Sequence, residues 1–463
     1  MLKTIPLESE SFSFAKLKKL IPGYELMLKT ILAAILDRFE RDKNYRFIDT
    51  KLNLLTGENF YPLKNDDPVY KGKEIIYSWI QGRGLEALAG HMEWIEDSDC
   101  FSPVDRESFR KRITNMLETV ITATEENRAV NNGRMFFCMT QDGLALNIDN
   151  EGNLNHAKVL SNKSNFSDLF YSKGLFKAAW KLGKKELANK ATDYFKIVID
   201  DIINNKFHTD QQSFDHKNKV EYIPGKITQG PLMISLLGLA EIGRLETSEI
   251  WFDYAEKIIT HITDFHINTG QYDSLEMYDF IEAVDADGKP WINGNGILCD
   301  PGHALEFVGL ASKCLLLMRR HDKYKKLIER CKQLFPKVLL HAFELGFNEK
   351  ESGICKAYDL KECKVLNSDM PWWSLPETMR AAIELLELDP KTSFKQEIIT
   401  VIAKCSNAFV ANYINYDVHM MAYQTRDALG KVIKVIPATP DADPGYHTGL
   451  SIIDFITILK RLK

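Results

Sequence analysis

The chain has 463 residues, and its 45% hydrophobic content supplies enough apolar side chains for a large buried core. Its net charge of -5 comes from interspersed acidic and basic residues without a basic stripe, so nucleic acid is not an expected partner. The amino terminus lacks the apolar segment of an export signal, and the longest strongly apolar run, ILAAIL, cannot span a bilayer, so we expect a cytoplasmic protein that binds no membrane.

Six segments have apolar residues at three- and four-residue spacing with charges between them, which is typical of helices with one solvent face. In chain order they span residues 24–42, 107–124, 184–203, 247–265, 321–343 and 393–414. Six other segments are apolar on nearly all sides and rich in Gly and Ala, and they recur about every seventy residues. They span residues 76–95, 167–183, 229–242, 300–311, 370–386 and 443–459.

The alternation of these two kinds of helix predicts two concentric rings, an all-α (α/α)6 barrel of six inner and six outer helices. Turn residues such as Asp-Gly and Ser-Gly mark β-hairpins in the segments 133–153, 282–294, 346–365 and 418–437. These hairpins all connect an outer helix to the next inner one, so they should gather at one end of the barrel around a pocket. No Pro/Gly/Ser-rich linker divides the sequence, and we predict one catalytic domain over residues 1–463.

Two inner segments begin with Asp-Pro-Gly followed by a histidine, in DPGHALE at Asp300 and DPGYHTG at Asp443. Pro favours the first turn of a helix, so His303 and His447 are predicted to lie where a loop becomes an inner helix, facing each other across the pocket. Histidine can take up and return a proton near neutral pH, which suits acid–base catalysis. The alternative is that each histidine only caps its helix.

Other polar residues occur near the starts of the inner helices. Glu306 follows His303 by three residues, and Arg83 and Glu377 lie in WIQGRGLEAL and WWSLPE. Arg83 could hold a substrate oxygen as charge develops on it, or form a buried ion pair with Glu86 or Glu377.

Trp372 and Trp373 are the best candidates for stacking on a pyranose, although a Trp in an apolar helix is more often a core residue. His303 and Glu306 could supply two metal ligands, but no third ligand lies at a matching local spacing. The eight cysteines contain no C-x-x-C pair and are predicted to be reduced and mostly buried, and no phosphate-binding loop occurs. We expect no metal and no cofactor.

The sequence resembles the N-acylglucosamine 2-epimerases, whose wider superfamily includes cellobiose 2-epimerases and mannose isomerases. The likeness covers nearly the whole chain and rests on PGHALE at 301–306, WWSLPE at 372–377, the arginine of WIQGRGLEAL and the terminal histidine. It implies that His303 and His447 form an acid–base pair, and that Arg83, Glu306 and Glu377 bind the sugar and assist ring opening.

Two departures from that family pattern bear on the substrate. Many cellobiose epimerases and mannose isomerases have a further histidine where this chain has Ile234, which favours the N-acylglucosamine branch. The terminal histidine is usually followed by Pro-Arg, whereas this chain reads GYHTGLSIIDF.

The resemblance implies a sugar epimerase that inverts C2 of an aldose or N-acylhexosamine by proton abstraction and return through an enediolate. Returning the proton to C1 would instead make it an aldose–ketose isomerase. An (α/α)6-barrel glycoside hydrolase with Glu306 and Glu377 as its paired carboxyl groups is a second class, and a binding protein on an inactive barrel is a third. The expected partner is a small sugar, with a homodimer as a candidate assembly.

Overall fold

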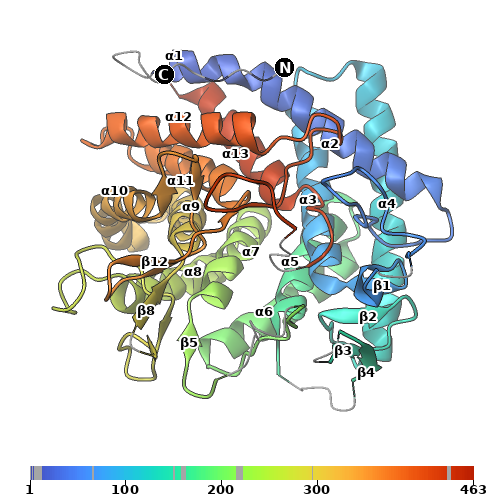
Figure 1. The fold of residues 1–463 in the computed structure, drawn as a ribbon, viewed down its shortest axis with the longest axis horizontal. Helices are drawn as coiled ribbons and strands as arrows, with labels where there is room; N and C mark the ends of the chain where they lie inside the picture. Colours follow the sequence, from blue (N-terminus) through green and yellow to red (C-terminus); the bar gives the residue numbers. More distant parts are fainter. Residues whose placement is uncertain are drawn as a thin grey trace.

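The computed structural model describes residues 2, 4, 13–64, 67–149, 152–157, 163–214, 223–294, 296–434 and 439–462. Within these residues helices dominate, and they wind around a common centre so that the blue start and the red end of the chain lie side by side (Figure 1). Short helical turns precede or follow the longer helices: α1 (Phe14–Leu17), η1 (Lys18–Leu20), η2 (Val69–Lys71), η3 (Ile262–His266) and η4 (Asp322–Tyr324).

Six inner helical segments form a closed ring within the described part of the chain. They are α3 (Ser78–Asp97), α5 (Phe166–Lys181), α7 (Gly230–Glu246), α9 (Pro301–Met318), α11 (Ser374–Leu388) and the continuous pair η5 (Tyr446–Leu450) and α13 (Ser451–Arg461). Each contacts the next, and η5 returns to α3. Their side chains are buried on nearly all sides, because neighbours cover both flanks.

Six outer helices cover this ring in the described residues. They are α2 (Ile21–Arg41), α4 (Pro103–Val130), α6 (Lys185–Ile203), α8 (Glu249–His261), α10 (Lys325–Gly346) and α12 (Lys395–Asn412). Helix α6 shows why the sequence places them outside: Ala188, Ala191, Phe195, Val198 and Ile202 are buried at three- and four-residue spacing, with charged residues between them. The predicted (α/α)6 barrel is therefore confirmed.

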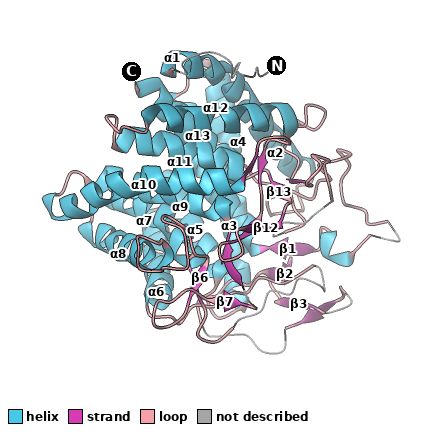
Figure 2. Ribbon diagram, turned by 60° about the vertical axis from the view of Figure 1, so that its left-hand side comes forward, coloured by secondary structure: helices cyan, strands magenta, loops and turns pink. Residues whose placement is uncertain are grey.

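The strands are short, antiparallel and lie along one side of the helical body (Figure 2). Two-stranded pairs join β1 (Ile75–Tyr77) to β2 (Cys138–Thr140), β3 (Leu146–Ile148) to β4 (Leu154–His156), β5 (Ile227–Thr228) to β6 (Ala283–Val284), β9 (Phe347–Asn348) to β10 (Gly353–Ile354) and β13 (Met370–Pro371) to β14 (Thr425–Arg426). A four-stranded sheet has the order β12 (Lys364–Asn367), β11 (Ala357–Asp359), β8 (Gly296–Cys299), β7 (Ile292–Asn293). Parts of two predicted hairpins, residues 150–151 and 435–437, lie outside the described residues.

Two inner helices begin later than the sequence predicts, because strand pairing takes their first residues. Ile76 belongs to β1, so α3 begins at Ser78. Met370 and Pro371 pair with β14, so both tryptophans of the following segment precede α11. All cysteines are free thiols, buried except for half-buried Cys100 and exposed Cys363, which confirms that expectation.

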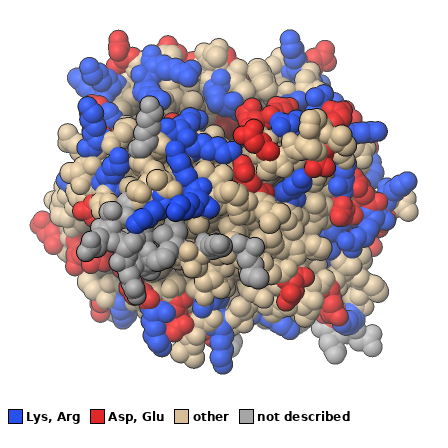
Figure 3. Space-filling view, turned by 90° about the horizontal axis from the view of Figure 1, so that it is seen from above, with Lys and Arg blue, Asp and Glu red and all other residues tan. Residues whose placement is uncertain are grey.

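The surface drawn in Figure 3 carries charged side chains of both signs, Lys and Arg together with Asp and Glu. None of the described helices combines the length and hydropathy needed to cross a bilayer.

The close approach of α3 to α5 gives a test of the inner ring. A Cβ atom on Gly82 would lie 2.6 Å from the carbonyl carbon of Phe170, a backbone atom that cannot move alone. We expect Gly82→Ala to lower the free energy of unfolding by about 1–3 kcal/mol, measured by urea denaturation. As a control, Gly230→Ala, whose Cβ would meet only Phe166 at 3.9 Å, should stay within about 1 kcal/mol of wild type. Equal effects of the two substitutions would contradict this packing.

Candidate active site

The first predicted corner is built by an aspartate that caps α9. Oδ1 of Asp300 accepts hydrogen bonds from the backbone N–H groups of Gly302 at 3.0 Å and His303 at 3.4 Å. These groups would otherwise lack partners at a helix start, so the cap fixes the first turn and the histidine in it. His303 retains 27% exposure, which leaves its ring open to a ligand.

The second corner uses the same device with one residue more. Oδ1 of Asp443 accepts from the N–H of Tyr446 at 2.9 Å and Oδ2 accepts from that of Thr448 at 3.0 Å. Gly445 has a φ of 85°, a left-handed conformation that favours glycine. His447 therefore lies in the wider π-helical turn η5, not in the first α-helical turn as predicted, because Tyr446 separates it from Asp-Pro-Gly.

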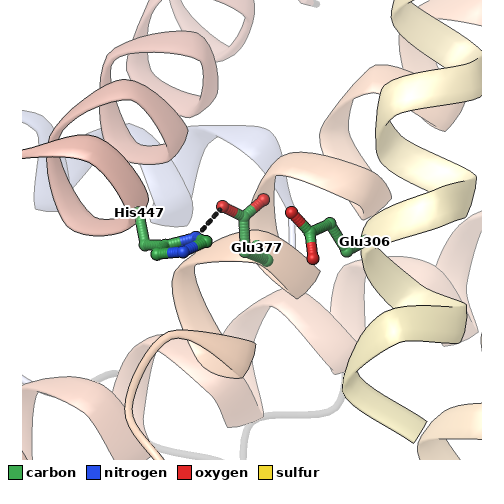
Figure 4. Close-up of side chains that lie close together, drawn as sticks. All are labelled: Glu306, Glu377 and His447. Carbon is green, nitrogen blue, oxygen red and sulfur yellow. Dashed lines mark hydrogen bonds and ion pairs between the residues drawn. The ribbon is translucent and has the colours of Figure 1, made fainter. Parts of the chain in front are cut away.

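His447 joins a cluster of carboxylates contributed by α9 and α11 (Figure 4). Its Nδ1 donates to Oε1 of Glu377 at 2.9 Å. The other oxygen of Glu377 accepts a short hydrogen bond from Arg380, one turn along α11. Glu306 completes the cluster, with one atom each of Glu306, Glu377 and His447 lying within 4.8 Å of one another.

His303 is held from a different direction. Its Nδ1 lies 3.1 Å from Oε1 of Glu282, which precedes β6, and 3.4 Å from Oδ2 of Asp300. Glu282 also accepts from Nε2 of Gln229 at 3.3 Å, and Asp300 pairs with Lys356. Each of these partners comes from a different segment of the chain.

Trp373 connects the two histidines. Its ring centre lies 5.5 Å from that of His303 and 5.7 Å from that of His447, and the rings are tilted by 30° and 38°. Gly302 makes this possible, because a Cβ there would lie 2.8 Å from Cη2 of Trp373. Trp372 meets His447 edge-on and donates to Thr448. Both tryptophans therefore lie beside histidines, and their predicted stacking on a sugar stays a prediction.

Arg83 forms neither of the ion pairs considered from the sequence. Its guanidinium carbon lies 4.2 Å from the ring centre of Phe170 and 5.6 Å from that of Tyr446. Among the residues that the structure describes, its buried Nε has no hydrogen-bond partner. A guanidinium held by aromatic rings keeps its N–H donors for another acceptor. Glu86 instead pairs with Lys173, which also donates to the hydroxyl of Tyr446 at 2.7 Å.

Burial and neighbouring charges move the pKa values of the site in opposite directions. Burial, together with the charge of Glu377, raises the pKa of Glu306. Burial would raise the pKa of Glu377 too, but Arg380 and His447 outweigh it and hold that pKa below its usual range. Burial lowers the pKa of His303, but Asp300 and Glu282 outweigh it and raise the pKa to about 9.

The carboxylate cluster is close enough to surround a small cation, although its chemistry points to hydrogen bonding. Arg380 already supplies positive charge to Glu377, and Nδ1 of His447 is engaged by the same carboxylate. Burial and the charge of Glu377 raise the pKa of Glu306. Because Arg380 and His447 each bond to Glu377, we interpret the cluster as a hydrogen-bonded network. The sequence suggested His303 and Glu306 as a pair of metal ligands, but the histidine in this cluster is His447.

The structure brings together all seven residues singled out from the sequence. It also shows further residues that contact them. Arg380 carried a usable signal, because it is a charge in an apolar inner helix three residues after Glu377. Asp300 stood in the Asp-Pro-Gly motif as a capping residue. Glu282 and Lys356 gave no local signal, because only the folding of the loops brings them to His303.

The comparisons with known proteins agree with this architecture. A family model described as N-acylglucosamine 2-epimerase (GlcNAc 2-epimerase) matches residues 120–448. No curated protein sequence gave a significant match.

Three solved structures are similar over nearly the whole chain. A cellobiose 2-epimerase from Bacillus thermoamylovorans B4167 has a TM-score of 0.67 at 12% identity, covering 95% of this chain and 99% of its own. A sugar epimerase from a ruminal bacterium has a TM-score of 0.63 at 13% identity, covering 93% and 97%. A D-mannose isomerase has a TM-score of 0.59 at 15% identity, covering 94% and 98%.

The ring of helices, with its histidines and carboxylates at one end, defines the class as an (α/α)6-barrel carbohydrate epimerase or isomerase. The chain belongs to the N-acylglucosamine 2-epimerase family.

The buried pair of Lys173 and Glu86 supports the wall beside Arg83 and can be tested through stability. Both side chains are 1% exposed, so Lys173→Met leaves an unpaired charge and should cost about 3–5 kcal/mol of unfolding free energy in urea denaturation. The double variant Lys173→Met/Glu86→Leu should recover most of that loss. On the same helix, Lys181→Met breaks the more exposed pair with Glu96 and should cost only about 0–1 kcal/mol. A double variant no more stable than the single one would contradict the pairing.

Proposed function

We propose that the protein inverts C2 of an aldose or N-acylhexosamine, using His303 and His447 as its two proton-transfer groups. The observation that carries the proposal is that both histidine rings contact the same indole, that of Trp373, although they lie in different repeats. Inversion at C2 needs two groups that reach the same carbon from two sides. Two histidines held at one end of the barrel supply that requirement.

The hydrogen bonds of the site leave the chemistry to one nitrogen of each ring. Because Nδ1 of His303 and Nδ1 of His447 each contact a carboxylate, Nε2 of each ring is the atom available to the substrate. One histidine removes the C2 proton from the open-chain sugar, and the other returns a proton from the opposite face. The hydrogen leaves and returns as a proton, so the scheme requires no redox cofactor.

Arg83 and Glu306 have the properties needed for the remaining steps. The donors of Arg83 can bind the oxygen on which negative charge develops in the enediolate. Burial and the charge of Glu377 raise the pKa of Glu306, so this carboxyl group holds a proton more readily than an exposed one. When protonated, it can donate to the ring oxygen during ring opening.

The hydrolase alternative fits the site less well. An inverting glycosidase needs carboxyl groups about 6.5–9.5 Å apart to admit a water. Glu306 and Glu377 place oxygens within 4.8 Å, and Arg380 and His447 occupy both oxygens of Glu377.

Hydrogen exchange in deuterated water tests the function. The protein is incubated with a panel of aldoses and N-acylhexosamines, and NMR follows deuterium at C1 and C2. We expect deuterium at C2 of both epimers of one sugar, and the exchange should persist in EDTA because histidines move the proton. Label at C1 of a ketose product would indicate the isomerase instead, and cleavage without carbon-bound label would indicate a hydrolase.

Replacing His303 and replacing His447 should impair the reaction in different ways. His303→Asn and His447→Asn keep the approximate shape and remove the proton carrier, so each should slow epimerisation by about 10²- to 10⁴-fold. Each variant keeps one base, and it should therefore still exchange the C2 hydrogen of one epimer, a different epimer in each variant. Near wild-type epimerisation by both variants would remove the histidines from the mechanism.

A further inference from the structure

His303 contacts the carboxylate of Glu282, and a neutral amide, that of Gln229, holds this carboxylate in place. Nδ1 of His303 lies 3.1 and 3.2 Å from the two oxygens of Glu282. Glu282 in turn accepts from Nε2 of Gln229 at 3.3 Å. Gln229 is fully buried at the start of α7, so it fixes the position of Glu282 without neutralising its charge.

The support behind His447 also runs through a glutamate to a second side chain, but here that side chain is charged. Nδ1 of His447 lies 2.9 Å from Oε1 of Glu377, and the second oxygen of Glu377 is bonded to Arg380. Glu377 and Arg380 are 1% and 2% exposed, so water screens this pair little. The guanidinium offsets the charge that Glu377 presents to its histidine.

The two aspartate corners add to this difference. In DPGH the histidine is the third residue after Asp300, and Oδ2 of Asp300 lies 3.4 Å from its Nδ1. In DPGYH the inserted tyrosine makes the histidine the fourth residue after Asp443, and both oxygens of Asp443 accept backbone N–H groups. Only the first corner therefore turns a carboxylate toward its own histidine ring, within the described residues.

The remaining charged neighbours do not cancel the difference. Beside His303, Lys356 from the loop between β10 and β11 pairs with Asp300 and also attracts Glu282, so this one cation faces two carboxylates. Glu306 of α9 interacts with both histidines, and burial together with the charge of Glu377 raises its pKa, so its charge does not distinguish the two rings.

On the side of His447, the cations balance the carboxylates. Arg380 pairs with Glu377 and lies 3.9 Å from Asp454, which Lys313 also holds. Arg83 of α3 lies over Tyr446, near enough to Asp443 and Glu377 for attraction. The surroundings of His303 are thus more negative than those of His447.

We propose that Glu282 and Arg380 are positioning residues that make the two histidines unequal, so that the proton of the resting site resides on His303 and His447 is left as the base. The inference rests on the proposed function for its catalytic meaning, but the proton distribution is a property of the free protein. In the resting state His447 would abstract the C2 proton and His303 would deliver one. The epimer with the opposite configuration requires the reverse distribution, which the charges disfavour.

NMR of the protein labelled with ¹⁵N-histidine tests the distribution without substrate. His303→Asn and His447→Asn assign the two resonances among the 11 histidines. In wild type, the ¹⁵N shifts should show His303 protonated at a pH where His447 is neutral. Glu282→Gln keeps an acceptor for His303 and removes the charge, so the titration midpoint of His303 should fall by about one pH unit or more. Equal titration of the two rings, or an unmoved His303 in Glu282→Gln, would overturn the proposal.

The pH profile of kcat/KM for epimerisation supplies a second readout. Glu282→Gln should move the alkaline limb to lower pH, because His303 loses its proton more easily. Arg380→Gln should move the acidic limb to higher pH, because the uncompensated charge of Glu377 stabilises a proton on His447. Arg380→Lys should restore the limb, since it restores the charge. A purely structural role would lower kcat and leave both limbs in place.

The control and the outcomes separate this proposal from the proposed function. Glu276→Gln removes one exposed carboxylate from the same connection as Glu282 and should leave the NMR midpoints and the profile unchanged. If Arg380→Gln does not fold, wild type and Glu282→Gln still decide the matter by NMR. Unequal histidines in a protein that exchanges no sugar hydrogen would refute the function alone, whereas epimerisation with equal histidines would refute the inequality alone.

Discussion

Closure of the inner ring between η5 and α3 is the contact on which the rest of the structure depends. It brings the last repeat against the first, so that Tyr446 lies over Arg83 and accepts a hydrogen bond from Lys173. Close packing there requires small residues, since a Cβ on Gly449 would lie 2.9 Å from Nε2 of His91. Without this seam, His447 and Arg83 would belong to opposite ends of an open array of helices.

The same kind of aspartate-capped turn precedes both histidines, yet the charges around the two rings differ. An aspartate side chain fixes the turn before each histidine, and this repetition is visible in the sequence as Asp-Pro-Gly. One added residue, Tyr446, changes the turn from α to π and directs both oxygens of Asp443 to backbone N–H groups. The repeated corner therefore gives similar placement of the rings and different electrostatics, because the distance from aspartate to histidine along the turn differs.

The tryptophans show what residue type alone leaves open. Strand pairing at Met370 and Pro371 places Trp372 and Trp373 before α11, beside the histidines, and their contact with a sugar stays a prediction. The ion pairs considered for Arg83 from the sequence do not form, because Lys173 pairs with Glu86 and Arg380 pairs with Glu377.

The sequence by itself determined the double ring of helices, the corners of His303 and His447, and the presence of Arg83, Glu306 and Glu377 near inner-helix starts. Periodicity, capping and turn chemistry are local properties, and they are encoded within a few neighbouring residues. Only the tertiary structure decided which carboxylate holds which histidine, since Glu282 and Glu377 are separated from their partners by 21 and 70 residues. Those contacts depend on how loops fold over the barrel and on ring closure, and such long-range geometry has no signature in local spacing.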